Sequence, residues 1–183
     1  MSNAKLIIHA LEYAARKHEG QYRKTPKIKI PYISHPAGVG IFLQKAGCDE
    51  EVIAAGILHD VIEDCGVTRK ELAKEFNERI SDLVWAVSEH DKSKPWKERK
   101  AIYLEQLKTA DQDALAIASA DHIYNMTNIL MALEDGVDIW ASFEPEMEEK
   151  LDIEKQLLEI VRGKISDVLT KELEGVIKEL SSL

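Results

Sequence analysis

The chain has 183 residues, of which 45% are hydrophobic and 31% are charged, and its formal net charge is −9. This length predicts one compact domain over residues 1–183 with no room for a second catalytic domain. The negative charge disfavours nonspecific binding to nucleic acid or anionic membrane, and the sequence has neither a signal peptide nor an apolar run approaching the ~20 residues of a membrane span.

The first part of the chain has a helical period with recognisable start and stop signals. Pro36 suits the first helical position of one helix, and Gly47 suits its C-terminal cap. Asp49 is expected to cap the next helix, and Thr68 and Glu71 form a capping box. The helices expected here are 3–18, 35–47, 49–64 and 68–76.

One early stretch, GQYRKTPKIKIPYIS, interrupts this helical pattern. Its alternation of lysine and isoleucine over 27–30 permits a short β-hairpin near residues 22–33. The stretch also carries basic residues close together, so it can supply positive charge to a site in an otherwise acidic protein.

The remaining segments are also helical in pattern, with helices expected at 78–89, 97–108 and 112–133. The tail, 144–182, reads as two amphipathic helices separated near Gly163. The fold class is therefore all-α, a bundle of about eight or nine helices. Only two cysteines occur, outside any Cys-x-x-Cys arrangement, which indicates a reduced, cytoplasmic protein.

Four ionisable residues interrupt the apolar segment AAGILHDVIEDCG, residues 54–66: they are His59, Asp60, Glu63 and Asp64. On a helix, His59 and Asp60 flank one wedge of surface, and each is followed four positions later by a carboxylate on the same face. Burying such groups without a partner is costly. A divalent cation would neutralise the carboxylates and accept the imidazole lone pair.

Two other segments offer side chains to the same cation. Asp121 lies in the middle of an expected helix, with Asn125 and Asn128 on its face, and these residue types are poor helix formers that suggest the wall of a site. His35 precedes Pro36 at a helix start. Together His35, His59, Asp60 and Asp121 form a mixed nitrogen and oxygen set suited to Mn²⁺, Fe²⁺ or Zn²⁺, with open positions for water and substrate.

The sequence resembles the HD phosphohydrolase superfamily, whose motifs follow the order H…HD…D. Three stretches, YRKTPKIKIPYISHPAGV, AAGILHDVIEDCGVTRKELAKEF and ASADHIYNM, resemble the hydrolase domain of the RelA/SpoT family in order and spacing. The single-domain length and the stretch HDKSKPWKERKAIYLEQL look most like the stand-alone small alarmone hydrolases of the metazoan SpoT homologue type. The resemblance covers a core of about residues 4–133.

This resemblance implies an all-helical, Mn²⁺-dependent hydrolase that removes the 3′-pyrophosphate of the nucleotide (p)ppGpp, giving GDP or GTP. By the resemblance, the four ligands of one metal ion are His35, His59, Asp60 and Asp121. Glu63 and Asp64 match the acidic pair that positions and activates the attacking water. The substrate-binding residues implied are Arg23, Lys24 and Asn125.

The sequence departs from the family pattern at a few positions. Ala118 and Ser119 replace a Lys-Leu pair, and His122 replaces the basic residue that follows the aspartate. Trp140 and Phe143 are the candidates for aromatic residues that enclose the nucleotide. Two alternatives remain open: an HD phosphohydrolase acting on another nucleotide, such as a 5′-nucleotidase, and a catalytically silent nucleotide-binding module.

Overall fold

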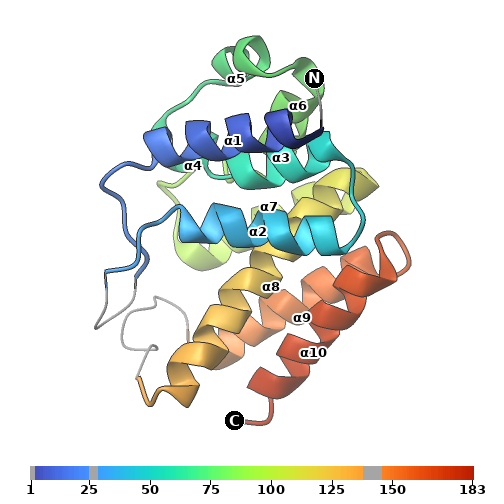
Figure 1. The fold of residues 1–183 in the computed structure, drawn as a ribbon. Coiled ribbons are helices and arrows are strands. Elements are labelled where there is room, and N and C mark those ends of the chain that lie inside the picture. Colours follow the sequence, from blue (N-terminus) through green and yellow to red (C-terminus); the bar gives the residue numbers. More distant parts are fainter. Residues whose placement is uncertain (1–2, 25–28, 138–145) are drawn as a thin grey trace.

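A computed structural model of the chain describes residues 3–24, 29–137 and 146–183 (Figure 1). These residues form ten helices and no sheet, which confirms the all-α class. In them, no helix combines the length and apolar character needed to cross a bilayer. The helices are α1 (Asn3–Lys17), α2 (Ser34–Lys45), α3 (Glu50–Leu58), α4 (Val61–Cys65), α5 (Arg69–Glu75), α6 (Glu78–Val87), α7 (Trp96–Lys108), α8 (Gln112–Glu134), α9 (Met147–Val161) and α10 (Asp167–Leu180).

The continuous helix expected over 49–64 is wrong, because the chain divides it at His59 and Asp60. Asp60 has φ −91° and ψ −8°, in the sparsely populated region between helix and strand, and α4 begins just after it. This break adds one short helix to the number expected. It also means that His59 and Glu63 do not lie on one regular helical face.

The stretch that permitted a hairpin forms a single antiparallel bridge between Tyr22 and Pro31 in the described part of the chain. The amide of Arg23 donates to the carbonyl of Ile30 at 2.9 Å beside this bridge. Residues 25–28, including Lys27, lie outside the described residues. The bridge brings Arg23 back toward the start of α2.

Several of the expected helix caps are confirmed. The Asp49 side chain accepts from the amides of Glu51 and Val52 at the start of α3. Thr68 and Glu71 form the complete capping box of α5. Caps of this kind satisfy the amides that have no partner inside the helix, so these boundaries could be read from the sequence.

Helix α3 lies in the middle of the molecule, where α1, α2, α6 and α8 pack against it (Figure 1). Two glycines of these helices allow close approach. A Cβ on Gly56 of α3 would lie 2.1 Å from Leu43 of α2, and one on Gly38 of α2 would lie 2.0 Å from the Tyr124 ring of α8. Because larger residues would clash at both points, these glycines set α2 against α3 and α8.

The tail helices join the same buried cluster of apolar side chains, which runs from α1 to α10. A buried ion pair adds to this packing: His122 Nδ1 of α8 lies 2.7 Å from Glu154 Oε2 of α9. The other oxygen of Glu154 is 3.0 Å from Lys150 Nζ. Burial alone would raise the pKa of this carboxyl, but His122 and Lys150 outweigh it and lower the pKa to about 2.

We expect Glu154→Ala to lower the free energy of unfolding by about 3 kcal/mol or more, because it leaves the partners of a fully buried carboxylate uncompensated. Urea unfolding followed by circular dichroism measures this change. Glu148→Ala is the matched control, since Glu148 is exposed on the same helix and should change stability by less than about 0.5 kcal/mol. Equal losses in the two variants would contradict the importance of the buried pair.

Candidate metal and active site

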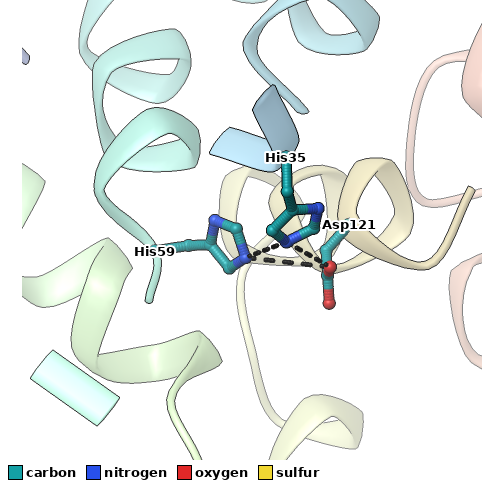
Figure 2. Close-up of side chains that lie close together, drawn as sticks. All are labelled: His35, His59 and Asp121. Carbon is teal, nitrogen blue, oxygen red and sulfur yellow. Dashed lines mark hydrogen bonds and ion pairs between the residues drawn. The ribbon is translucent and has the colours of Figure 1, made fainter. Parts of the chain in front are cut away.

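Three of the predicted metal ligands lie together in the structure (Figure 2). His35 comes from the first turn of α2, His59 follows the last residue of α3, and Asp121 lies in the middle of α8. The two Nε2 atoms are 3.1 Å apart, and Asp121 Oδ1 lies 3.2 Å from His35 Nε2 and 3.7 Å from His59 Nε2. One ligand atom from each side chain thus faces a common point.

The fourth predicted ligand, Asp60, lies beside the same two imidazoles. Its Oδ2 is 3.0 Å from His59 Nε2 and 3.4 Å from His35 Nε2. The Tyr32 hydroxyl donates to this oxygen at 2.6 Å, and the Tyr32 ring packs edge-on against His35. Tyr32 therefore fixes the carboxylate of Asp60 toward the histidines.

The hydrogen bond of His59 decides which of its ring nitrogens can bind a cation. Nδ1 donates to the Gly56 carbonyl at 2.8 Å, so the lone pair of the neutral ring is on Nε2, facing the cluster. Burial alone would lower the pKa of His59, but the Asp60 and Asp121 carboxylates outweigh it and raise the pKa to about 10. The surroundings therefore favour positive charge at this point.

The spacing of these atoms fits a divalent metal ion. Around an octahedral ion with bonds of about 2.1–2.2 Å, neighbouring ligand atoms lie about 3.0–3.1 Å apart. Four of the distances among the ligand atoms of His35, His59, Asp60 and Asp121 lie between 3.0 and 3.4 Å, close to this value. The distance from His59 Nε2 to Asp121 Oδ1 is longer, at 3.7 Å. Two imidazole nitrogens and carboxylate oxygens form the donor set typical of first-row metals.

The acidic pair Glu63 and Asp64 lies on α4, directly after the histidine cluster. Glu63 Oε2 accepts from the Glu89 amide at 3.0 Å, and burial raises the pKa of Glu63 above its usual range. Lys92 Nζ is 3.2 Å from Glu63 Oε1 and also pairs with Asp64. Lys94 and Lys97 of the same segment contact Glu98 and Glu149 instead.

The predicted substrate residues are only partly gathered at this site. Arg23 donates to Asn125 Oδ1 at 2.7 Å, and Asn125 donates in turn to Asp121 Oδ1 at 2.6 Å. The Arg23 guanidinium also lies 5.5 Å from the ring centres of both Tyr32 and Tyr124. Lys24 is exposed and does not line the described cavity.

A cavity of about 190 Å³ opens over this cluster. Six of the residues around it were not predicted as site residues, although Tyr32, Lys100, Tyr103 and His122 stand within stretches that resemble the family. Val87 and Glu89 lie outside these stretches. The described residues lining the cavity are Arg23, Tyr32, His35, His59, Asp60, Glu63, Asp64, Val87, Glu89, Lys100, Tyr103, Asp121, His122 and Asn125.

The departures from the family pattern lie in different surroundings. Ala118 and Ser119 are buried in α8, where the Ser119 hydroxyl donates to the Leu115 carbonyl of its own helix. His122 is buried and faces both the cavity and Glu154. The candidate aromatic residues Trp140 and Phe143 lie outside the described residues.

The HD domain family matches residues 10–143, which is most of the chain. The chain belongs to the HD domain family. The matched region contains every predicted metal ligand.

Curated relatives include guanosine-3′,5′-bis(diphosphate) 3′-pyrophosphohydrolases called MESH1. The protein from Xenopus tropicalis is 36% identical over 74% of this chain and 75% of its own length. The protein from Homo sapiens is 33% identical over 98% of this chain and 94% of its own length. A bacterial pyrophosphohydrolase from Borreliella burgdorferi is 39% identical, but the match covers 68% of this chain and only 19% of that protein.

Solved structures show a similar fold over nearly the whole of this chain. A metazoan ortholog of SpoT, described as hydrolysing ppGpp, superposes with a TM-score of 0.81 at 27% identity over 97% of both chains. A protein from Listeria monocytogenes superposes with a TM-score of 0.72 at 29% identity, over 85% of this chain and 99% of that one. The first match includes the tail helices, which lie outside the core of about residues 4–133 in which the motifs resemble the family.

Proposed function

We propose that this HD domain protein is a metal-dependent (p)ppGpp 3′-pyrophosphohydrolase. The observation that carries the proposal is the convergence of His35, His59, Asp60 and Asp121 in one cavity beside Glu63. The similarity to stand-alone 3′-pyrophosphohydrolases over most of both chains supports the same activity. Residues 1–183 would act as one hydrolase domain in the cytoplasm, with a nucleotide rather than nucleic acid or a membrane as partner.

In this proposal, His35, His59, Asp60 and Asp121 hold one divalent ion, most suitably Mn²⁺ because the donor set mixes imidazole and carboxylate. Such an ion supplies positive charge that polarises a phosphoryl oxygen and makes water more acidic. Tyr32 orients Asp60 through its hydroxyl, and the Gly56 carbonyl orients His59. Partners of this kind hold ligands in the productive orientation.

Glu63 and Asp64 would position the attacking water and accept its proton. The raised pKa of Glu63 suits a base working near neutral pH. Water attacks the phosphorus attached to the ribose 3′-oxygen, a new oxygen–phosphorus bond forms, and the bond to the 3′-oxygen breaks. The 3′-oxygen takes the electron pair and a proton, and the two phosphates leave together as pyrophosphate.

Arg23, Lys24 and Asn125 would contact the nucleotide. Arg23 has a neutral hydrogen-bond partner in Asn125, so its charge is available to a phosphate or to the face of a base. Lys24 follows on the exposed side of the same segment and would add positive charge at the entrance. A protein with net charge −9 needs such local positive charge to collect a polyanion.

With Mn²⁺, we expect the protein to convert ppGpp to GDP with release of one pyrophosphate, and not of two successive orthophosphates. Chromatography of the products, with colorimetric assays for both phosphates, tests this result. The adenine counterpart of ppGpp and a panel of 5′-monophosphates serve as comparison substrates. Orthophosphate release from 5′-monophosphates with ppGpp untouched would establish a nucleotidase instead, and binding of ppGpp without turnover would establish a silent module.

A further inference from the structure

Lys100 of α7 brings a positive charge to the cavity, and none of the predicted substrate residues lies on this helix. It lines the cavity with the metal cluster, although only 22% of its side chain is exposed. Its Nζ lies 2.6 Å from Glu89 Oε1 and 5.4 Å from the centre of the Tyr103 ring. These contacts fix the ammonium group, so it does not sample the positions of a free surface lysine.

The charge of Lys100 is not fully neutralised by its partner. Arg99 Nη1 lies 2.8 Å from the other oxygen of Glu89, so two cations share one carboxylate. Lys92, by comparison, is held between two carboxylates. The group formed by Glu89, Arg99 and Lys100 therefore retains one positive charge.

Glu89 also ties this group to the reaction centre, because its backbone amide donates to Glu63 Oε2 at 3.0 Å. One residue thus holds Glu63 through its main chain and Lys100 through its side chain. The short segment after α6 therefore sets the positions of both Glu63 and the Lys100 ammonium group. This arrangement suits a substrate that must present its anionic group in one position beside the base.

The size of the cavity indicates which part of a nucleotide reaches Lys100. Its volume of about 190 Å³ is below the roughly 300–1,000 Å³ of pockets that enclose a drug-sized ligand. The space between the described residues therefore suits the diphosphate that is cleaved, with the nucleoside further out. The nearby metal cluster faces the same space.

We infer that Lys100, held in place by Glu89, binds the diphosphate group of the substrate and of the pyrophosphate product. The identity of the substrate in this inference rests on the proposed function. The binding of a diphosphate group at Lys100 does not depend on it. A charge-assisted contact of an ammonium to a phosphoryl oxygen is strong enough to change affinity about tenfold or more. The role assigned to Lys100 is binding and positioning; proton transfer stays with Glu63.

The test compares Lys100→Met with Arg99→Met in the Mn²⁺-loaded protein. Arg99 is the matched control because it contacts the same Glu89 but lines a neighbouring cavity with His90, Ile102 and Gln106. Calorimetric titration with inorganic pyrophosphate, with the same Mn²⁺ concentration in both solutions, measures binding without any nucleotide. Steady-state kinetics with ppGpp then separate KM from kcat.

We expect Lys100→Met to weaken pyrophosphate binding and to raise the KM for ppGpp, each about tenfold or more, with a much smaller change in kcat. Lys100→Arg should restore most of the affinity, and Arg99→Met, which removes a charge of the same group but no contact with the cavity, should lower it clearly less than Lys100→Met does. Lys100→Gln replaces the methionine variant if that protein does not fold. Unchanged pyrophosphate affinity in the Lys100 variants, or equal losses in the Lys100 and Arg99 variants, would overturn the inference. Failure of the wild type to hydrolyse ppGpp would refute the proposed function, while the pyrophosphate titration would still decide the role of Lys100.

Discussion

His59→Ala is expected to remove the metal ion and with it nearly all hydrolytic activity. His59 presents Nε2 to the cluster because its Nδ1 is committed to the Gly56 carbonyl, so no other atom of the residue can replace the lost ligand. We expect metal affinity to fall on the order of 100-fold or more. Since a metal ion supplies several kcal/mol of charge stabilisation, ppGpp hydrolysis should fall about 10³-fold or more. Metal analysis after gel filtration and the rate with Mn²⁺ measure both effects.

His9→Ala is the matched control for this prediction. His9 lies on α1, where its Nε2 contacts Glu75 at 2.9 Å, away from the cavity. Its removal should leave one metal ion per chain and an unchanged rate. The wild type should hold one ion, so two ions per chain, or a full complement in His59→Ala, would contradict the metal site proposed here.

The parts of the fold that local signals specify could be predicted from the sequence. Asp49, Thr68 and Glu71 satisfy amides within three residues of themselves, so the starts of α3 and α5 depend on neighbours in the chain. The break at His59 and Asp60 could not be read in this way. The residues around it have an apolar helical pattern, and the structure ends α3 where His59 meets His35 of α2 and Asp121 of α8.

The histidine and aspartate cluster could be predicted because a buried charge needs a partner, and few partners suit two imidazoles and two carboxylates. Its motifs also stand at family spacing, and the structure brings together His35, His59 and Asp121. Glu154 illustrates what the sequence leaves hidden. It occupies a core position of α9 among apolar residues, and its partner His122 lies 32 residues earlier. Only the packing of α9 on α8 makes the two meet.

Lys100 and Glu89 were not predicted as site residues for a related reason. Both belong to a strongly charged stretch, where a solvated surface is the usual interpretation. The fold gives each a different role by placing the start of α7 beside the segment that follows α6. A charged residue with few exposed atoms is therefore informative in the structure, although its type and spacing are unremarkable in the sequence.

Glu63→Gln should lower kcat about 100-fold or more while the metal ion stays bound, because glutamine keeps the shape but cannot accept a proton. Its amide oxygen can still accept from the Glu89 amide, so the segment after α6 should keep its position. Rate measurements at saturating ppGpp and metal analysis of the same sample test the two halves of this expectation. Glu98→Gln, on the exposed side of α7, controls for the loss of one negative charge.

The pH dependence gives a second signature of Glu63. Burial raises the pKa of its carboxyl most strongly, and the nearby Asp60 carboxylate raises it further, against the opposing Glu89 amide and Lys92. Only the ionised form can accept a proton, so kcat of the wild type should fall as the pH drops through this raised pKa. In Glu63→Gln that acidic limb should disappear, leaving a low and flatter profile. Retention of the limb would assign it to another group, and loss of the metal ion in Glu63→Gln would make Glu63 a ligand.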